Sequence, residues 1–304
     1  MTGSNKPDRH IAEMGIQFRR VVIIGVGLIG GSLGLLLKRK ALAQSVVGVG
    51  RRFDNLELAV KMGAIDSYEL VPQQAVTQAD LVILATPVET YAAHLQAWGQ
   101  SLPARSIVSD VGSVKGALVE QAEALLPDEV YFVGAHPIAG REKSGVAYAS
   151  SDLFHGARCI ITPTSKTNPH ALMRVRQLWE AAGSVVTMMD PFDHDWILGA
   201  VSHLPHLAAF ALMSTLQDLQ ESMPPRALNL FEYSGGGLRD TTRIAASSPE
   251  MWRDICLANR ERLVPMIDAY VHRLEQLKEC LQHVDGDTLH DLIHRAKVLR
   301  EQLP

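Results

Sequence analysis

Residues Arg19–Lys38 read RRVVIIGVGLIGGSLGLLLK, and this stretch decides the fold. Residues 19–24 are largely β-branched, which is typical of a strand. The pattern G-x-G-x-x-G follows, and then an apolar run typical of a helix. Between a strand and a helix, such glycines allow a tight turn, close approach of a pyrophosphate, and close packing of helix on strand. The stretch therefore predicts a dinucleotide site formed by Gly25, Gly27, Leu28, Ile29 and Gly30.

The second predicted strand, Val46–Val49, bears on the choice of cofactor. It ends at Gly50-Arg51-Arg52, where an NAD site usually places an acidic residue against the ribose hydroxyls. No acidic residue stands there, and the two arginines could bind a 2′-phosphate. Asp54 comes later, at capping-box spacing with Glu57, and is expected to start the next helix. We therefore expect Arg51 to contact the cofactor and NADP to be favoured, with NAD still usable.

Strands and helices continue to alternate along the chain. Strand patterns cover residues 81–85, 107–109, 131–133, 158–161 and 184–187, and helical patterns cover 88–98 and 169–182. This alternation predicts an α/β fold with a Rossmann-type, doubly wound, mostly parallel sheet. The turn Thr86-Pro87 closes one of these strands and is expected to contact the cofactor.

After Asp190-Pro191 the sequence has no strand pattern and is helical throughout. A heptad stripe, typical of paired helices, is formed by Leu263, Ile267, Tyr270, Leu274, Leu277 and Leu281. We therefore predict a loose tail over residues 1–17, a dinucleotide-binding domain over 18–190, and an all-α substrate and dimerisation domain over 191–304.

The segment Trp196–Leu216 contains no Asp, Glu, Lys or Arg. Its length alone would allow it to span a bilayer. His203 and His206 lie near its middle, however, and two imidazoles inside a bilayer would be costly. We expect a helix buried in the centre of the protein or of a homodimer, and no membrane partner.

The bulk composition is that of an ordinary globular protein. Of the 304 residues, 47% are hydrophobic and 20% are charged. The chain is long enough for two domains and for a large hydrophobic core. The net charge of −4 offers no basic surface for nucleic acid, so a small-molecule partner is expected. The three cysteines are scattered, which favours a reducing cytoplasm and disfavours disulfides or a thiolate metal site.

His136 is the candidate for the chemistry. It comes shortly after the apolar strand Tyr131–Val133, in a turn rich in glycine and proline up to Gly145. Ligands of open α/β sheets bind at the carboxyl ends of the strands, and a neutral imidazole can accept a proton there near pH 7. A histidine that fills a loop or the core is the structural alternative.

Several motifs in one order resemble prephenate dehydrogenases, including the cyclohexadienyl dehydrogenases that also accept arogenate. They are the glycine loop, Asp110–Gly116 (DVGSVKG), Ala135–Gly145, Val201–His206 (VSHLPH), Gly235–Arg243 (GGGLRDTTR) and Pro249–Asp254 (PEMWRD). The resemblance covers residues 19–281. It implies a Rossmann domain followed by a helical dimerisation domain, and oxidative decarboxylation of prephenate to 4-hydroxyphenylpyruvate on the route to tyrosine.

The resemblance also implies roles for individual residues. His136 matches the histidine that takes the proton of the ring hydroxyl, and Ser113 matches the serine that holds this hydroxyl and the nicotinamide side. Arg243 matches the arginine that grips a substrate carboxylate, for which a guanidinium fork is suited. Further substrate contacts are implied for His206, Gly236, Asp240 and Trp252, where structural roles remain open.

Two further points concern ligands at these motifs. Glu142, close to the site by resemblance, could favour the amine of arogenate. His203 is interpreted as structural, and no carboxylate shares the spacing of His203 and His206, so no metal site is expected.

Two alternatives to a prephenate dehydrogenase stay open at this point. A 3-hydroxyacid or 3-hydroxyacyl dehydrogenase shares the dinucleotide fold, a helical second domain and a histidine after a strand, although its substrate needs no counterpart of His206 and Arg243. A non-catalytic dinucleotide sensor would bind the cofactor without turnover of any dienyl acid.

Overall fold

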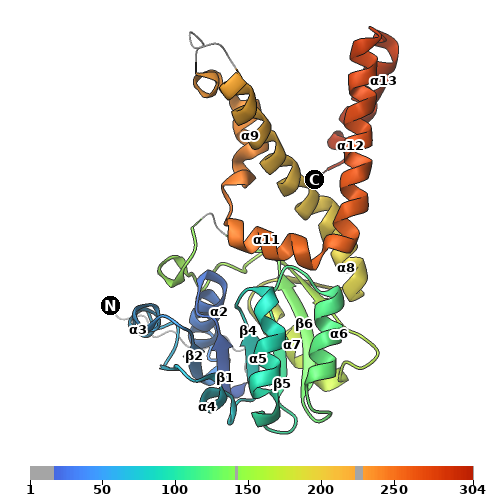
Figure 1. Cartoon of the computed structure of the whole chain (residues 1–304). Coiled ribbons are helices and arrows are strands. Elements are labelled where there is room, and N and C mark those ends of the chain that lie inside the picture. Colours follow the sequence, from blue (N-terminus) through green and yellow to red (C-terminus); the bar gives the residue numbers. More distant parts are fainter. Residues whose placement is uncertain (1–16, 141–142, 223–228, 304) are drawn as a thin grey trace. The chain divides into compact units, whose positions relative to one another are not determined.

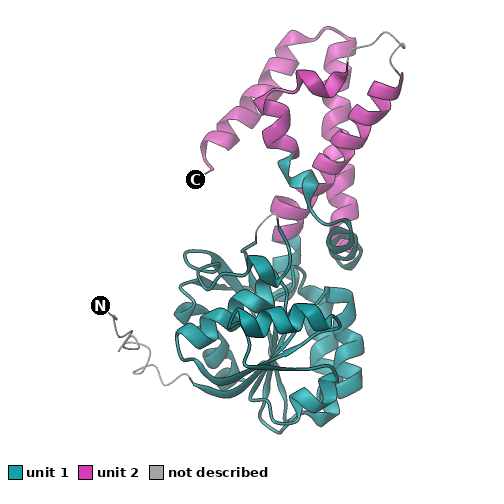
Figure 2. Ribbon diagram, turned by 90° about the vertical axis from the view of Figure 1, so that its left-hand side faces the viewer, with its two compact units in different colours: residues 1–197, 243–258 teal, residues 198–242, 259–304 magenta. Residues whose placement is uncertain are grey.

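The computed structural model describes residues 17–140, 143–222 and 229–303 of the 304-residue chain. These fall into two compact units, coloured separately in Figure 2. Unit 1 comprises the chain up to Ile197 together with Arg243–Ala258, and unit 2 comprises Leu198–Thr242 and the chain from Asn259. Each unit thus consists of two separate segments of the chain, whereas the sequence predicts a single boundary near Asp190. Residues 1–16 of the expected tail lie outside the described residues.

Unit 1 is built on one sheet of eight strands (Figure 1). Their order across the sheet is β3-β2-β1-β4-β5-β6-β7-β8, and every pair of neighbours is parallel except β6 and β7. This confirms the doubly wound, mostly parallel sheet. The strands are β1 (Phe18–Ile24), β2 (Ala43–Val49), β3 (Ser67–Glu69), β4 (Leu81–Leu84), β5 (Ile107–Asp110), β6 (Tyr131–Pro137), β7 (Arg158–Thr162) and β8 (Val185–Met188).

The structure corrects the strand prediction in two places. The strand expected over residues 131–133 continues to Pro137, because its last four residues pair with β7 in an antiparallel ladder. His136 therefore lies within β6, opposite Ile160, and not in the turn after it. The short edge strand β3 was not predicted, since its three residues, Ser-Tyr-Glu, carry no apolar run.

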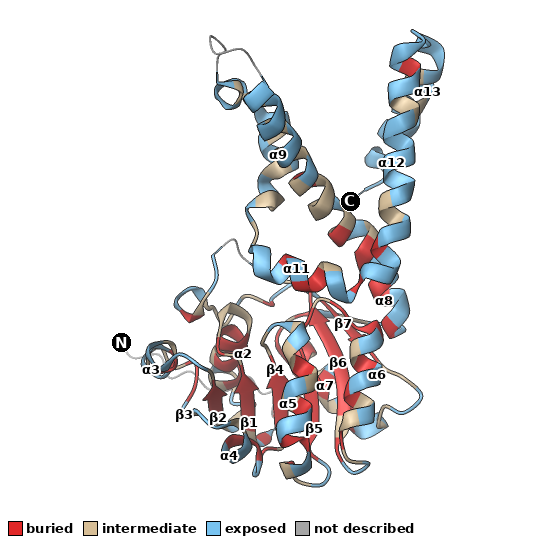
Figure 3. Cartoon of the chain, in the orientation of Figure 1, coloured by how far each residue is buried: buried red, intermediate tan, exposed pale blue. Residues whose placement is uncertain are grey.

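Helices cover both faces of the sheet because successive strand residues point to opposite sides. Val21 and Ile23 of β1 pack in one core, and Val22 and Ile24 pack in the other. The first core is closed by α2 (Leu28–Arg39), α3 (Phe53–Lys61) and α7 (Pro169–Ala181). The second is closed by α4 (Pro72–Val76), α5 (Tyr91–Trp98) and α6 (Gly116–Leu125). Figure 3 shows the buried residues concentrated along these strands.

Helix boundaries also differ from expectation. The helix predicted over residues 88–98 is split into a 3-10 turn, η1 (Val88–Thr90), and α5. Helix α3 begins at Phe53 with Arg52 at the N-cap position, so Asp54 lies inside the first turn and does not start the helix. The remaining 3-10 turns of this half are η2 (Gly99–Ser101) and η3 (Val146–Tyr148).

The three motif glycines meet three different steric demands. Gly25 has φ +98°, in the left-handed region, and a Cβ there would lie 2.6 Å from the Ala85 carbonyl oxygen. A Cβ on Gly30 would lie 2.2 Å from the carbonyl oxygen of Gly25, so the start of α2 packs directly on the loop. A Cβ on Gly27 would meet no atom within 4 Å. The backbone at Gly27 is thus open to a ligand.

Unit 2 is helical. It contains the π-helical turn η4 (Gly199–His203), α9 (Leu204–Ser222), η5 (Leu230–Tyr233), α10 (Gly236–Thr242), α12 (Arg260–Gln282) and α13 (Gly286–Glu301). The amide of Asn259 lies 3.0 Å from His203 Nδ1 and ties the π-helical turn to the start of α12. The preceding α8 (Pro191–Leu198), η6 (Arg243–Ala246) and α11 (Pro249–Ala258) lie wholly or almost wholly in unit 1.

Most residues of the long helices α9, α12 and α13 are exposed or partly exposed (Figure 3), and apolar residues are among them. Tyr270, Leu274 and Leu281 of the heptad stripe are 42%, 49% and 67% exposed. The continuous helix Pro191–Ser222 is the one described helix long and apolar enough to cross a membrane, and only 22% of its apolar window is buried. The expected burial of this helix is therefore not reached inside a single chain. Uncovered apolar surface of this kind suits contact with a second copy.

Gly30→Ala is expected to destabilise the apo protein, because the new methyl group would clash with backbone rather than with a movable side chain. We expect a loss of about 1–3 kcal/mol in the free energy of unfolding. The measurement is unfolding in urea, followed by the fluorescence of the tryptophans in unit 1. Gly27→Ala is the matched control and should stay within about 0.5 kcal/mol of the parent. Equal losses in both variants would contradict the packing role given to Gly30.

Candidate active site

A buried ion pair organises the carboxyl ends of β5 and β6. Lys115 Nζ lies 2.7 Å from Asp110 Oδ2, and both side chains are fully buried. Nζ also donates to the carbonyl oxygens of Gly112 at 2.6 Å and Val114 at 3.0 Å. An ammonium group has three N–H donors, and all three are used here. The loop that carries Ser113 is held on both sides of that residue.

Asp110 connects this loop to the strand that carries His136. Its Oδ2 accepts from the backbone N–H of Gly112, and its Oδ1 accepts from the backbone N–H of Ala135 at 3.0 Å. One carboxylate therefore joins the loop with Ser113, which follows β5, to the last residues of the adjacent strand β6, which include His136.

His136 is one end of a chain of buried hydrogen bonds. Its Nδ1 lies 2.9 Å from Nε2 of His194, and Nδ1 of His194 lies 2.8 Å from Asp195 Oδ1. His194 is fully buried, and His136 is 8% exposed. Asp195 in turn accepts from the backbone N–H groups of Lys115 and Gly116. Three segments far apart in the sequence thus meet at the catalytic candidate.

The start of α8 places His194 and Asp195 close to the end of β8. Asp190 Oδ1 accepts from the backbone N–H of Phe192 and of Asp193, and Pro191 fits the first turn, so α8 begins directly after β8. Asp195 on this helix then supplies an anion to the N-terminus of α6, where a carboxylate is favourable.

Burial sets the protonation behaviour of His194. Desolvation lowers the pKa of His194 below its ordinary value, and the hydrogen bond to Asp195 opposes this shift without cancelling it. His194 is therefore neutral at pH 7. A neutral imidazole has one donor and one acceptor nitrogen, as a link in a hydrogen-bond chain requires.

The cofactor candidates surround the first turn of α2. The N-cap residue of this helix is Gly27, which has no side chain to cap it, and the first turn of the helix has no acidic residue. The loop is braced by Asn55, whose Nδ2 donates to the Val26 carbonyl oxygen at 2.7 Å. Open backbone at an uncapped helix N-terminus fits a pyrophosphate. Leu28 and Ile29 form the start of this helix.

Arg51, Thr86 and Pro87 follow the neighbouring strands β2 and β4. Arg51 is exposed. Burial, and to a smaller extent the charge of Arg51, lowers the pKa of His94 on α5. The Thr86 and Thr90 hydroxyls are 2.7 Å apart and stiffen the turn. These residues lie at the carboxyl ends of β2 and β4, on either side of β1.

Arg243 and Trp252 group with the sheet and not with the other helices of the C-terminal half. Trp252 is 6% exposed on α11, and Arg243 is exposed at the start of η6. Partial burial and a hydrogen bond with Asp254 of α11 raise the pKa of Glu89 in η1. The two carboxyl groups lie close together, where α11 contacts the turn after β4.

The other three predicted substrate residues belong to unit 2. His206 is partly buried on α9, and its Nδ1 donates to the Ser202 carbonyl oxygen at 2.8 Å. Gly236 begins α10, and Asp240 is exposed on the same helix. Glu142 lies outside the described residues. The structure therefore groups Ser113, His136, Arg243 and Trp252 in one unit, and His206, Gly236 and Asp240 in the other.

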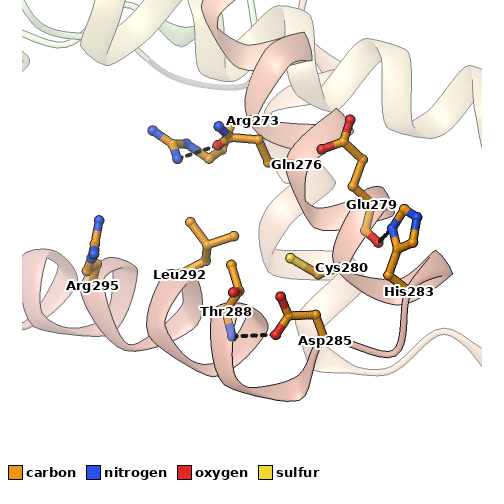
Figure 4. Close-up of a pocket in the computed structure, with 9 residues that line it drawn as sticks. All are labelled: Arg273, Gln276, Glu279, Cys280, His283, Asp285, Thr288, Leu292 and Arg295. Carbon is orange, nitrogen blue, oxygen red and sulfur yellow. Dashed lines mark hydrogen bonds between the residues drawn. The ribbon is translucent and has the colours of Figure 1, made fainter.

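A pocket of about 460 Å³ lies in unit 2 between α12 and α13 (Figure 4). Two hydrogen bonds join lining residues to one another: Arg273 donates to Gln276, and Asp285 accepts from the backbone N–H of Thr288. The latter bond is the N-cap of α13. No predicted site residue lines this pocket, which is a junction between helices.

Sequence reasoning missed the residues behind the site. Lys115 and Asp110 stand inside the motif DVGSVKG, and a buried strand ending directly in a charged residue was the available signal. His194 and Asp195 follow a predicted strand, and an adjacent His-Asp pair at a sheet edge was the signal there. Neither signal reveals which residue the side chain contacts, because these contacts depend on the order of the strands in the sheet.

The comparisons with known proteins agree with this geometry. Residues 33–188 match the family model described as "Prephenate dehydrogenase, nucleotide-binding domain", and residues 190–295 match "Prephenate dehydrogenase, dimerization domain". The prephenate dehydrogenase of Bacillus subtilis is 33% identical over 93% of this chain and 76% of its own length. The cyclohexadienyl dehydrogenase of Zymomonas mobilis is 32% identical over 90% of this chain and 92% of its own length.

A solved structure is similar over almost the whole chain. The prephenate dehydrogenase of Aquifex aeolicus, crystallised with hydroxyphenyl propionate and NAD+, has a TM-score of 0.87 and 38% identity. The match covers 95% of this chain and 100% of that one. With the two family models spanning both halves, these findings show that the chain belongs to the prephenate dehydrogenase family.

Proposed function

We propose that this protein catalyses the oxidative decarboxylation of prephenate to 4-hydroxyphenylpyruvate with hydride transfer to NAD(P), a step of tyrosine biosynthesis. Arogenate, which has an amino group where prephenate has a keto group, is included as a second substrate. The observation that carries the proposal is His136, an imidazole at the carboxyl end of β6, backed by His194 and Asp195 in a nucleotide-binding unit.

The open backbone at Gly27 and the N-terminus of α2 support a pyrophosphate site. Gly25, Leu28, Ile29 and Gly30 would shape this site, and Thr86 and Pro87 would border it. When bound, the nicotinamide supplies the acceptor for the hydride. Arg51, exposed after β2 with Gly50 in place of an acidic residue, supports a preference for NADP. The Aquifex relative was crystallised with NAD+, and NAD is retained as a usable cofactor.

His136 would move the proton in this reaction. Its imidazole takes the proton of the ring hydroxyl while the hydride leaves the same carbon, which turns the alcohol into a ketone. Loss of carbon dioxide then leaves its electron pair in the ring and makes the ring aromatic. The phenolate oxygen formed in this way can take the proton back from His136, so no net proton remains on the enzyme. Ser113 would hold the same oxygen through its hydroxyl.

The remaining candidates would bind the substrate. Arg243 would bind a carboxylate through its guanidinium fork. His206, Gly236, Asp240 and Trp252 are retained as substrate-contacting residues on the strength of the motifs that they match. Residues 18–190 would then form the dinucleotide-binding domain, and residues 191–304 the substrate and dimerisation domain.

The proposal also includes that the protein is a homodimer and that it is located in the cytoplasm. The exposed heptad side chains and the dimerization-domain match at residues 190–295 support the dimer. The cysteines Cys159, Cys256 and Cys280 are all unpaired, which suits a reducing compartment. The hydroxyacid dehydrogenase alternative is not favoured, because both halves match prephenate dehydrogenase models.

The direct assay mixes the purified protein with prephenate or arogenate and with NAD or NADP, and follows absorbance of the reduced nicotinamide. We expect reduction with prephenate. A protein that binds the cofactor but reduces it with neither substrate would support the dinucleotide-sensor alternative.

His136→Asn should keep cofactor affinity and lower kcat, because it removes the proton acceptor and leaves the glycine loop intact. The expected fall is about 10²–10⁴-fold, measured by steady-state kinetics. His170→Asn, at an exposed position of α7, is the matched control and should behave like the parent. Turnover of His136→Asn within a few-fold of the parent would exclude His136 as the base.

Arg243→Ala should mainly raise KM for prephenate. A charge-assisted hydrogen bond to a carboxylate contributes about 1.5–3 kcal/mol, which corresponds to roughly a ten- to hundredfold rise in KM. Arg176→Ala on the exposed face of α7 controls for loss of a cation. An unchanged KM for prephenate would remove Arg243 from the substrate site.

Arg51→Ala should raise KM for NADP and leave KM for NAD nearly unchanged, because only NADP carries the 2′-phosphate. Lys61→Ala, another exposed cation on the helix that follows β2, is the control and should change neither constant. A parent enzyme that favours NAD, or equal weakening of both cofactors by Arg51→Ala, would show that Arg51 does not bind the phosphate.

A further inference from the structure

We infer that His194 and Asp195 are positioning residues that hold the neutral ring of His136 with its proton on Nδ1, so that Nε2 is the nitrogen that accepts the substrate proton. This inference rests on the proposed role of His136 as the base. It concerns a different property, the tautomer of the resting ring, and it gives a specific role to His194 and Asp195, which the proposed function uses only as neighbours of His136.

The direction of the hydrogen bonds is set at Asp195. Its Oδ1 accepts from the backbone N–H of Lys115 at 2.7 Å, and its Oδ2 accepts from the backbone N–H of Gly116 at 2.8 Å. A backbone N–H can only donate, so both carboxylate oxygens act as acceptors. Nδ1 of His194, 2.8 Å from Oδ1, must then be the donor.

The second ring nitrogen of His194 follows from the first. A neutral imidazole that donates from Nδ1 can only accept at Nε2. Nδ1 of His136 lies 2.9 Å from that nitrogen and must therefore carry a hydrogen. His194 is fully buried, so water cannot replace either bond. In the neutral ring of His136, Nε2 is left with the lone pair.

This tautomer matters because it is not the one that an isolated histidine prefers. In water the neutral imidazole of histidine favours the proton on Nε2, the nitrogen farther from the backbone. A ring in that form could not accept a proton at Nε2. The His194–Asp195 pair would thus keep His136 in the reactive form, and it would also accept the Nδ1–H bond after His136 becomes charged.

The same packing could instead serve only to fill space between α8 and the sheet. The two interpretations differ in what a substitution of similar shape does. His194→Phe keeps a ring but has no acceptor for His136. His194→Gln keeps an amide oxygen that can accept from Nδ1 of His136. If space filling were the whole role, the phenyl ring would be the better replacement.

The test is ¹⁵N NMR of the histidine rings in the full-length protein, with the His136 signals assigned by their loss in His136→Asn. At a pH where the ring is neutral, we expect Nδ1 to be protonated and Nε2 unprotonated in the parent. His194→Phe should shift His136 toward Nε2–H, and His194→Gln should retain Nδ1–H. His170→Gln, at an exposed position, is the control.

Kinetics give a second readout. A wrong tautomer of the catalytic histidine lowers kcat about 10⁴-fold in serine proteases, and we expect His194→Phe to lower kcat by about 10²–10⁴-fold with KM for the cofactor unchanged. His194→Gln should recover most of this loss. A uniform effect of both variants would indicate a merely structural role and overturn the inference.

The two proposals can fail separately. A parent ring with its proton on Nε2, or a tautomer unchanged by His194→Phe, would overturn the positioning role even if the enzyme oxidises prephenate. An Nδ1–H ring in a protein that His136→Asn does not impair would support the hydrogen-bond direction and overturn the role of His136 as the base. If His194→Phe does not fold, the tautomer of the parent ring alone decides.

Discussion

The buried ion pair between Asp110 and Lys115 is the constraint on which the rest of the site depends. Taking two charges out of water is unfavourable, and such a pair is stable only when its remaining donors and acceptors are also bound. Here the three N–H groups of Lys115 meet three oxygens, and Asp110 accepts from two backbone N–H groups as well. Removing one partner would leave an uncompensated charge, for which a loss of about 3–5 kcal/mol is typical.

This pair links stability to chemistry. Lys115 fixes the loop around Ser113 through its side chain, and its backbone N–H binds Asp195, which begins the hydrogen-bond chain to His136. The reacting residues are therefore held by groups at the end of β5, at the start of α6 and on α8. Rigid support of this kind keeps donors and acceptors oriented before substrate arrives.

Much of the fold could be predicted because the signals are local. Residues close in sequence determine the strand Arg19–Ile24, the glycine loop and the alternation of strands and helices. The parallel sheet could be predicted from this alternation. The extension of β6 to Pro137 and the His136–His194 contact could not be predicted in this way, because they depend on β7 pairing antiparallel with β6 and on where β8 ends. Likewise, the grouping of Arg243–Ala258 with unit 1 depends on contacts between segments far apart in the sequence, such as α11 with η1.

The π-helical turn Gly199–His203 has a consequence for the evolution of this helix. A π-helical turn holds an additional residue relative to an α-helix, and each residue of an α-helix turns the chain by about 100°. Because the wide turn absorbs the additional residue, loss of one residue within 199–203 would restore regular α-helical winding and leave the register of α9 with His206 unchanged. The side chains of the turn itself would shift instead, so the consequence of such a deletion would fall on the contact between His203 and Asn259.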